Sequence, residues 1–97
     1  LRKWISDHHM TITDEKVVED AGKTYEIVCL SPAFHDSYTE EEIKYGPVLL
    51  KNRDIEFLDY LDRRIEKNHV IASKVTDKTK KNQLLMEAEE MKQIRQR

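Results

Sequence analysis

Apolar and polar positions alternate in the first third of the chain. Residues 10–18 are rich in β-branched side chains, and residues 24–30 place Tyr25, Ile27 and Cys29 on one face of a strand. The polar break between the two runs contains Gly22, which can adopt the positive φ of a tight turn. This pattern predicts a β-hairpin. Because Pro32 cannot donate to a ladder, we expect the second strand to end before it.

Further along the chain, the apolar spacing becomes helical. We expect a helix that begins after Asn52 or Asp54, runs to about residue 68 and packs on the hairpin. Residues 69–75 are richer in β-branched side chains and indicate a third strand. The apolar positions of the helix recur at intervals of three and four residues: Ile55, Leu58, Leu61 and Ile65.

A short helix is expected between these two regions. Thr39 and Glu42 have the spacing of a capping box, in which each side chain accepts a hydrogen bond from the other's backbone. The pair Gly46-Pro47 then ends the helix. The acidic residues 40–42 fit the positive end of the helix dipole, so they need no catalytic explanation.

The last segment, residues 76–97, reads as a polar helix that begins near Asp77 and has a narrow apolar face. This face covers fewer than two heptads, which is too short for a coiled coil. It can pack on the chain's own body, or it can dock on a neighbouring protein subunit. The candidate partner-binding residues are Leu84, Leu85, Ala88, Met91 and Ile94.

Composition limits the size of the core. The chain has 97 residues, of which 38% are hydrophobic and 37% charged, whereas globular domains are usually more apolar and less charged. We expect a small α+β body over residues 1–75 and a charged helical appendage over residues 76–97. A domain this small and polar gains stability when a partner covers part of it.

The charge is unevenly distributed. Residues 1–73 contain 10 Lys/Arg and 15 Asp/Glu, whereas residues 74–97 contain 7 Lys/Arg and 4 Asp/Glu. In a continuous helix Lys74, Lys78 and Lys81 would share one face beside Lys80, which makes them candidate phosphate contacts. No aromatic residue follows Tyr60 to stack on bases, so the pattern favours a protein partner over nucleic acid.

The sequence shows no signature of catalysis, of a cofactor or of a metal. Cys29 is the only cysteine, and its apolar neighbours predict a buried, unreactive thiol. Gly22 and Gly46 are isolated, so no glycine-rich cofactor loop is present. The histidines lack the spacing of metal ligands: His8, His9, His35 and His69.

These observations predict a non-enzymatic structural or accessory subunit that docks into a larger assembly, such as a virion, through its C-terminal helix. One alternative is a nucleic-acid-binding accessory protein that uses the Lys74–Lys81 stripe, and a second is a small acidic regulatory or inhibitor protein presenting residues 40–42. No membrane span or secretory signal is visible, so we expect an intracellular or virion location. The start at Leu1 fits processing, a fragment or an unusual start codon.

Overall fold

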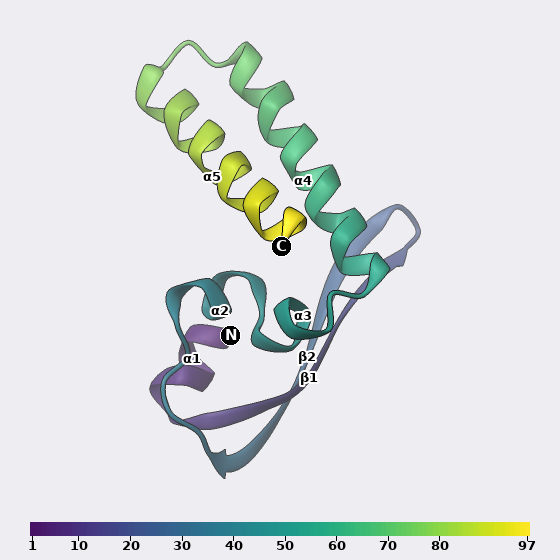
Figure 1. Cartoon of the computed structure of the whole chain (residues 1–97), viewed down its shortest axis with the longest axis vertical. Helices are drawn as coiled ribbons and strands as arrows, with labels where there is room; N and C mark the ends of the chain where they lie inside the picture. The colour runs from purple at the N-terminus through teal and green to yellow at the C-terminus, as the bar shows by residue number, and fades with distance from the viewer. The chain divides into compact units, whose positions relative to one another are not determined.

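A computed structural model describes all 97 residues and divides them into two compact units, Leu1–Phe57 (unit 1) and Leu58–Arg97 (unit 2). Five helices and a two-stranded antiparallel sheet confirm the expected α+β class (Figure 1). The elements in chain order are α1 (Arg2–Asp7), β1 (Met10–Asp20), β2 (Lys23–Phe34), α2 (Glu40–Tyr45), α3 (Pro47–Asn52), α4 (Ile55–Lys74) and α5 (Lys78–Gln96).

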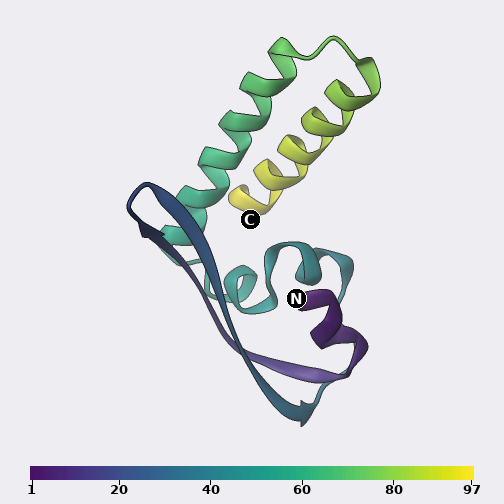
Figure 2. The same cartoon turned by 180° about the vertical axis from the view of Figure 1, so that it is seen from behind.

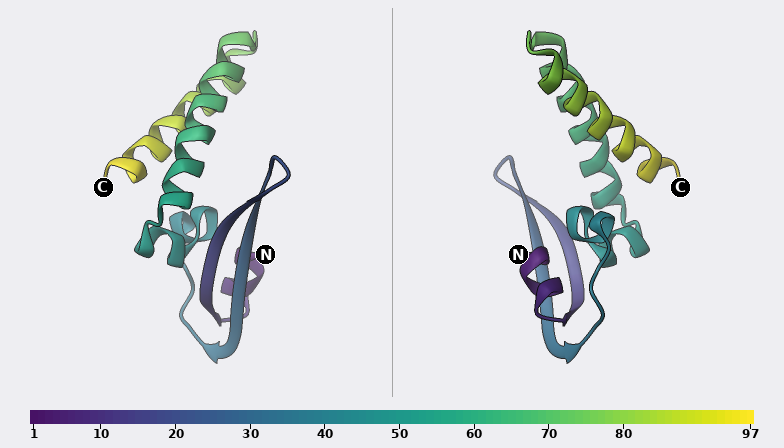
Figure 3. Two further views of the ribbon diagram at one scale, coloured as in Figure 1. Left: turned by 90° about the vertical axis from the view of Figure 1, so that its right-hand side faces the viewer. Right: turned by 90° about the vertical axis from the view of Figure 1, so that its left-hand side faces the viewer.

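The predicted hairpin is the largest feature of unit 1, and Figure 3 shows its two long strands from two sides. Ala21 and Gly22 form its turn with φ of 50° and 79°, the positive values that tight hairpin turns require. The expected end of β2 before Pro32 is wrong. Pro32 lies where the register shifts between the pairs Thr11–Ser31 and Met10–Phe34, so it interrupts the ladder without ending the strand.

One face of β1 supplies the core of unit 1. Ile12 and Val17 are buried on that face, and Ile12 clusters with Ile5 and Tyr38. The hydroxyl of Tyr38 accepts a hydrogen bond from the Ile12 backbone at 2.9 Å. The Tyr38 backbone in turn donates to Ser6 Oγ at 2.8 Å. These bonds fix α1, β1 and the segment before α2 against one another.

The capping box of α2 is confirmed. Glu42 N donates to Thr39 Oγ1 at 3.1 Å, and Thr39 N donates to Glu42 Oε1 at 2.9 Å. Gly46 ends this helix with a φ of 103°, and Pro47 occupies the first turn of α3. The sequence pattern predicted neither α3 nor α1, because helices of six residues contain too few positions to show a period.

In unit 2, α4 and α5 run antiparallel and side by side, as Figures 1 and 2 both show. Arg64 and Glu87 form an ion pair at 2.9 Å, and Asn68 Nδ2 donates to the Leu84 carbonyl at 3.1 Å. The predicted third strand is wrong, because residues 69–74 complete α4. The contacts of Asn68 and the burial of Ala72 stabilise the helix there and outweigh the local β preference.

The compact units divide at residue 57, whereas we expected a body that extends to residue 75. The difference follows from α4, because the segment read as a third strand of the body belongs to the helical pair. None of the five helices combines the length and the apolar character that crossing a bilayer requires.

Candidate nucleic-acid interface

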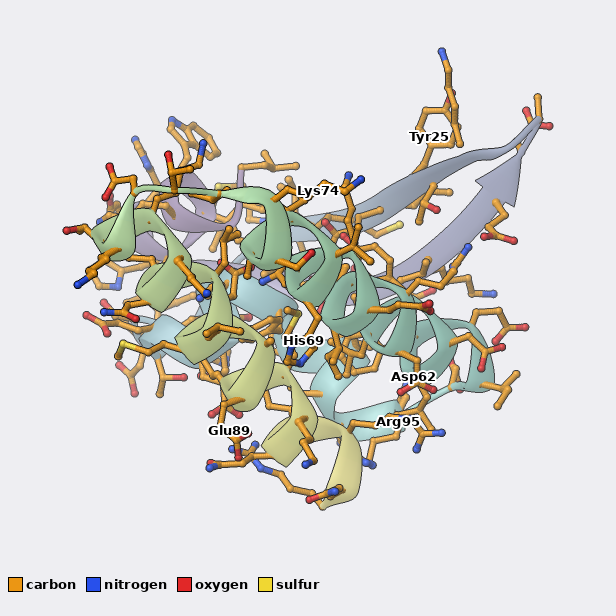
Figure 4. All side chains as sticks on the ribbon, turned by 90° about the horizontal axis from the view of Figure 1, so that it is seen from above. Tyr25, Asp62, His69, Lys74, Glu89 and Arg95 are labelled. Atoms are coloured by element: carbon orange, nitrogen blue, oxygen red, sulfur yellow. The ribbon has the colours of Figure 1, made fainter.

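Four lysines gather where α4 turns into α5. Lys74 is the last residue of α4, residues 75–77 form the connection, and Lys78 is the first residue of α5. Lys80 and Lys81 follow in the first turn and are exposed like the other two. Figure 4 shows Lys74 at the end of its helix. We call Lys74, Lys78, Lys80 and Lys81 the lysine turn.

This arrangement differs from the expected stripe along one continuous helix. The helix is broken at residues 75–77, and Asp77 starts α5 by accepting hydrogen bonds from Thr79 N at 2.9 Å and Lys80 N at 3.4 Å. The lysines therefore lie around a tight turn, and only Lys78 and Lys81 share a helical face.

The lysine turn carries a net positive charge, because its four lysines are accompanied by a single carboxylate, that of Asp77. None of the four ammonium groups takes part in an ion pair, and the first turn of α5 contains no acidic residue. Lysines at a helix N-terminus are opposed by the helix dipole, which costs about 0.3–1 kcal/mol each at low ionic strength. The same combination of ammonium groups and a helix N-terminus attracts phosphate.

The apolar face of α5 lies mostly inside the chain. Ala88, Met91 and Ile94 are buried, and Leu84 and Leu85 are half-buried. The apolar face of α5 therefore packs against the chain itself, which is one of the two arrangements that the sequence allowed. A role for these five residues in binding a partner stays a prediction.

A buried ionic cluster lies in unit 1. Arg2 Nε donates to Glu15 Oε2 at 2.6 Å, and Arg2 Nη2 donates to Glu26 Oε1 at 2.9 Å. Burial lowers the pKa of Arg2, but the hydrogen bonds and charges of the two carboxylates outweigh it, so the pKa is raised. The other oxygen of Glu15 accepts from the α3 backbone, from Val48 N at 2.7 Å and Leu49 N at 3.3 Å.

This cluster is structural, because every charge in it is paired. Glu15 caps α3 from β1, while Arg2 ties α1 to both strands. No sequence pattern indicated it, since Arg2 and Glu15 lie 13 residues apart and Glu15 and Val48 lie 33 apart.

The other side chains that were considered for catalysis or metal binding do not come together in a site. His8 stacks on Trp4, and His35 on Tyr38, each with ring centroids 4.2 Å apart. No group of three or more His, Cys, Asp or Glu side chains is placed to hold a metal ion. The prediction of a buried Cys29 is wrong, because β2 exposes this thiol.

Unit 1 also has a groove of about 370 Å³. Three carboxylates and one ammonium group line it, so its charge repels phosphate. It is therefore a weaker candidate than the lysine turn for binding a polyanion. Its lining consists of Lys16, Val17, Val18, Glu19, Leu49, Asp54, Glu56 and Phe57.

Comparison with protein families gives a match along nearly the whole chain. The model of the family TrmK, tRNA (adenine(22)-N(1))-methyltransferase, matches residues 1–96. A solved protein from Streptococcus pneumoniae, described as a proposed tRNA (m1A22) methyltransferase, is 26% identical with a TM-score of 0.84. The match covers 97% of this chain and 43% of that one. Its complex with S-adenosyl-L-methionine matches with a TM-score of 0.79, 26% identity and coverage of 97% and 41%.

Two further solved proteins have the same fold. The Bacillus subtilis m1A22 tRNA methyltransferase TrmK is 21% identical, with a TM-score of 0.65 and coverage of 98% of this chain and 44% of that one. A Streptococcus agalactiae protein of the NADB-Rossmann superfamily is 22% identical, with a TM-score of 0.80 and coverage of 97% and 41%. No curated protein matches the chain. The chain thus spans less than half the length of these relatives.

These matches correct the functional prediction. The expected non-enzymatic structural subunit, the virion assembly role and the acidic inhibitor are wrong, because the matching family consists of tRNA methyltransferases. The prediction of a protein that is not an enzyme is wrong for the same reason.

Proposed function

Because the chain belongs to the TrmK family of tRNA (adenine(22)-N(1))-methyltransferases, we propose that it is the part of such an enzyme that contacts tRNA. The family match over residues 1–96 carries this proposal. The reaction would methylate N1 of adenine 22. Since the solved relatives are more than twice as long as this chain, the chain would contribute to the reaction together with further protein.

The lysine turn is the surface that we assign to the tRNA backbone. Phosphates carry most of the affinity in protein–nucleic acid complexes, and unpaired lysines on an exposed turn can reach them without losing an existing ion pair. The four lysines meet this condition, and the one carboxylate among them, Asp77, accepts backbone N–H groups as the N-cap of α5. The absence of nearby aromatic residues means that we assign backbone contact, and not base recognition, to this surface.

The methyl donor does not fit the residues of this chain. Rossmann-type cofactor sites use glycines where the backbone approaches the cofactor. Here Gly22 lies in a hairpin turn, and the space beside Gly46 is filled by Glu15 and Arg2, whose side-chain atoms would lie 2.7–2.8 Å from an added Cβ. We therefore assign S-adenosyl-L-methionine, which the pneumococcal relative binds, to the further part of the enzyme.

A tRNA substrate also indicates where the protein would act, because a tRNA methyltransferase needs to meet tRNA. We accordingly propose an intracellular setting, with tRNA in place of the protein subunits that the sequence favoured as partners.

The proposal is tested by measuring the affinity of the chain for a tRNA transcript by fluorescence anisotropy. We expect Lys→Gln substitution of the whole lysine turn to weaken binding by about thirtyfold or more, as four lost charge contacts of about 0.5 kcal/mol or more each would. A matched control removes the same number of positive charges elsewhere, from the exposed and unpaired residues Lys23, Lys51, Lys67 and Lys92.

The control variant should bind with nearly wild-type affinity. Equal weakening in both variants would mean that only net charge matters, and it would remove the assignment to the lysine turn. Failure of the wild-type chain to bind tRNA at low salt would refute the proposed function. Circular dichroism spectra of both variants should match the wild-type spectrum, which shows that their helices are kept.

A further inference from the structure

Two aromatic–imidazole pairs stack at the end of the hairpin that lies opposite to its turn (Figure 1). The ring centroids of Trp4 and His8 are 4.2 Å apart, with an interplanar angle of 25°. Those of His9 and Phe34 are 5.4 Å apart, with an angle of 26°. The four rings come from α1, from its connection to β1 and from the last residue of β2, and we call them the ring patch.

Contacts with the rest of unit 1 hold the ring patch in place. His35 N donates to the His9 carbonyl at 2.9 Å, which joins the residue before β1 to the residue after β2. The His35 ring stacks on the buried Tyr38, with centroids 4.2 Å apart. The rings are therefore ordered before any ligand arrives, and this lowers the entropic cost of binding one.

The core of unit 1 leaves these rings open to solvent. Phe34 is 73% exposed and Trp4 is 51% exposed, and both histidines of the patch are exposed. Stacking covers one face of each ring, so the opposite faces remain accessible. Unpaired RNA bases stack on such side chains, with little dependence on sequence, because every base has a π-face.

The ring patch carries little charge. On α1, Asp7 is paired with Lys3 at 3.0 Å, and Asp36, which follows His35 in the chain, adds one further carboxylate. Phosphate is therefore not attracted to this surface, and a nucleic acid would be held there by stacking. The lysine turn has the opposite character, because it has ammonium groups for phosphate and no aromatic residue for bases.

We propose that the ring patch binds an unpaired base of the tRNA substrate by stacking. N1 lies on the Watson–Crick edge of adenine, so a tRNA that is methylated there presents at least one base outside a Watson–Crick pair, and its loops present others. The inference rests on the proposed function, because it takes tRNA as the ligand. It gives unit 1 the contact with bases that the lysines cannot make.

Trp4 provides the measurement, because it is the only tryptophan of the chain and belongs to the ring patch. A base that stacks on an indole ring quenches its fluorescence. The probes are a single-stranded oligoadenylate of about ten nucleotides, a duplex RNA with the same number of phosphates, and a tRNA transcript. We expect saturable quenching by the oligoadenylate and by tRNA, and none by the duplex, whose bases are not available for stacking.

Two matched variants locate the surface. Phe34→Leu removes one exposed ring and keeps an apolar side chain. It should weaken oligoadenylate binding by about fivefold or more and leave the salt dependence of tRNA binding unchanged, because no charge is lost. Tyr25→Leu removes another aromatic ring of β2, which is 49% exposed and lies outside the patch, and it should bind like the wild-type chain.

The outcomes separate this inference from the proposed function. Absence of quenching in a chain that binds tRNA overturns the ring patch and leaves the proposed function intact, and so does equal weakening in the two variants. Failure to bind tRNA refutes the proposed function, even where oligoadenylate still quenches Trp4. Trp4 emission that changes with protein concentration in the absence of RNA also overturns the inference, because a second copy of the chain would then cover the patch.

Discussion

Replacing Glu15 by alanine is expected to destabilise unit 1 by about 4–6 kcal/mol. The Glu15 carboxylate is fully buried, with 0% of its side chain exposed, and it accepts three hydrogen bonds from Arg2, Val48 and Leu49. The side chain of Arg2 is only 10% exposed, and it pairs with Glu15 and Glu26. After the substitution, Glu26 is the only one of these two carboxylates that still pairs with it.

The magnitude follows from the groups that lose a partner. Breaking a buried ion pair costs about 3–5 kcal/mol, and the lower end applies here because Arg2 keeps its bond to Glu26. The two backbone N–H groups of α3 lose their acceptor at about 1 kcal/mol or more each. A chain of this size has a total stability of about 5–10 kcal/mol, so the substitution removes about half of it.

Urea denaturation followed by tryptophan fluorescence measures this effect, because Trp4, the only tryptophan, lies in unit 1. Lys3→Ala is the control, because it breaks an ion pair with Asp7 in which the two side chains are 73% and 56% exposed. It should lower the free energy of unfolding by less than about 0.5 kcal/mol. A loss below about 1 kcal/mol for Glu15→Ala would refute the view that this cluster holds α1 and α3 on the hairpin.

Three further outcomes follow from the structure. Gly46→Ala should cost about 3 kcal/mol or more in the free energy of unfolding, because its Cβ would lie 2.7 Å from both carboxylate oxygens of Glu15 and its φ is 103°; a neutral effect in urea melts would contradict this. Asp77→Ala should cost α5 about 1 kcal/mol through the lost cap, and unchanged helicity on heating would argue against it. The pKa of Arg2 is raised, so its contribution to stability is complete below its unfolded pKa and is lost only as the pH rises through the higher folded pKa. The stability deficit of Arg2→Met should therefore be the same at about pH 7 and pH 10, and a deficit that shrinks over this interval would exclude a charged Arg2 as its cause.

The hairpin, the capping box of α2 and the start of α5 near Asp77 could be predicted because their signals are local. The turn at Gly22, the Thr39–Glu42 capping box and the Asp77 cap each depend on residues within a few positions of one another. The backbone conformation at these places is determined mainly by neighbouring residues, and the surrounding fold does not alter it.

Features that depend on distant residues could not be predicted. The β-branched residues 69–75 favour a strand locally, but the contact of Asn68 with the Leu84 carbonyl, 16 positions away, belongs to a helical pair. Cys29 has apolar neighbours in sequence, yet β2 exposes its thiol. Apolar neighbours in sequence do not by themselves bury a residue, because burial depends on what packs against its strand.

Membership of a methyltransferase family could not be predicted from the sequence for a related reason. An enzyme is recognised from its catalytic and cofactor residues, and Gly22 and Gly46 serve a turn and a close helix junction here. The four lysines were visible in the sequence as a basic stripe, but the absence of aromatic residues after Tyr60 favoured a protein partner. The structure breaks the helix at residues 75–77 and places these lysines around an exposed turn, which is the surface that we assign to tRNA.

The salt dependence of tRNA binding tests the central claim most directly. For each lysine that contacts a phosphate, the slope of log affinity against log salt concentration should flatten by about one when that lysine is replaced. We predict a slope flatter by about three to four for the glutamine variant of Lys74, Lys78, Lys80 and Lys81, and by less than about one for the control variant with equal net charge. Identical slopes for the wild-type chain and both variants would contradict the account.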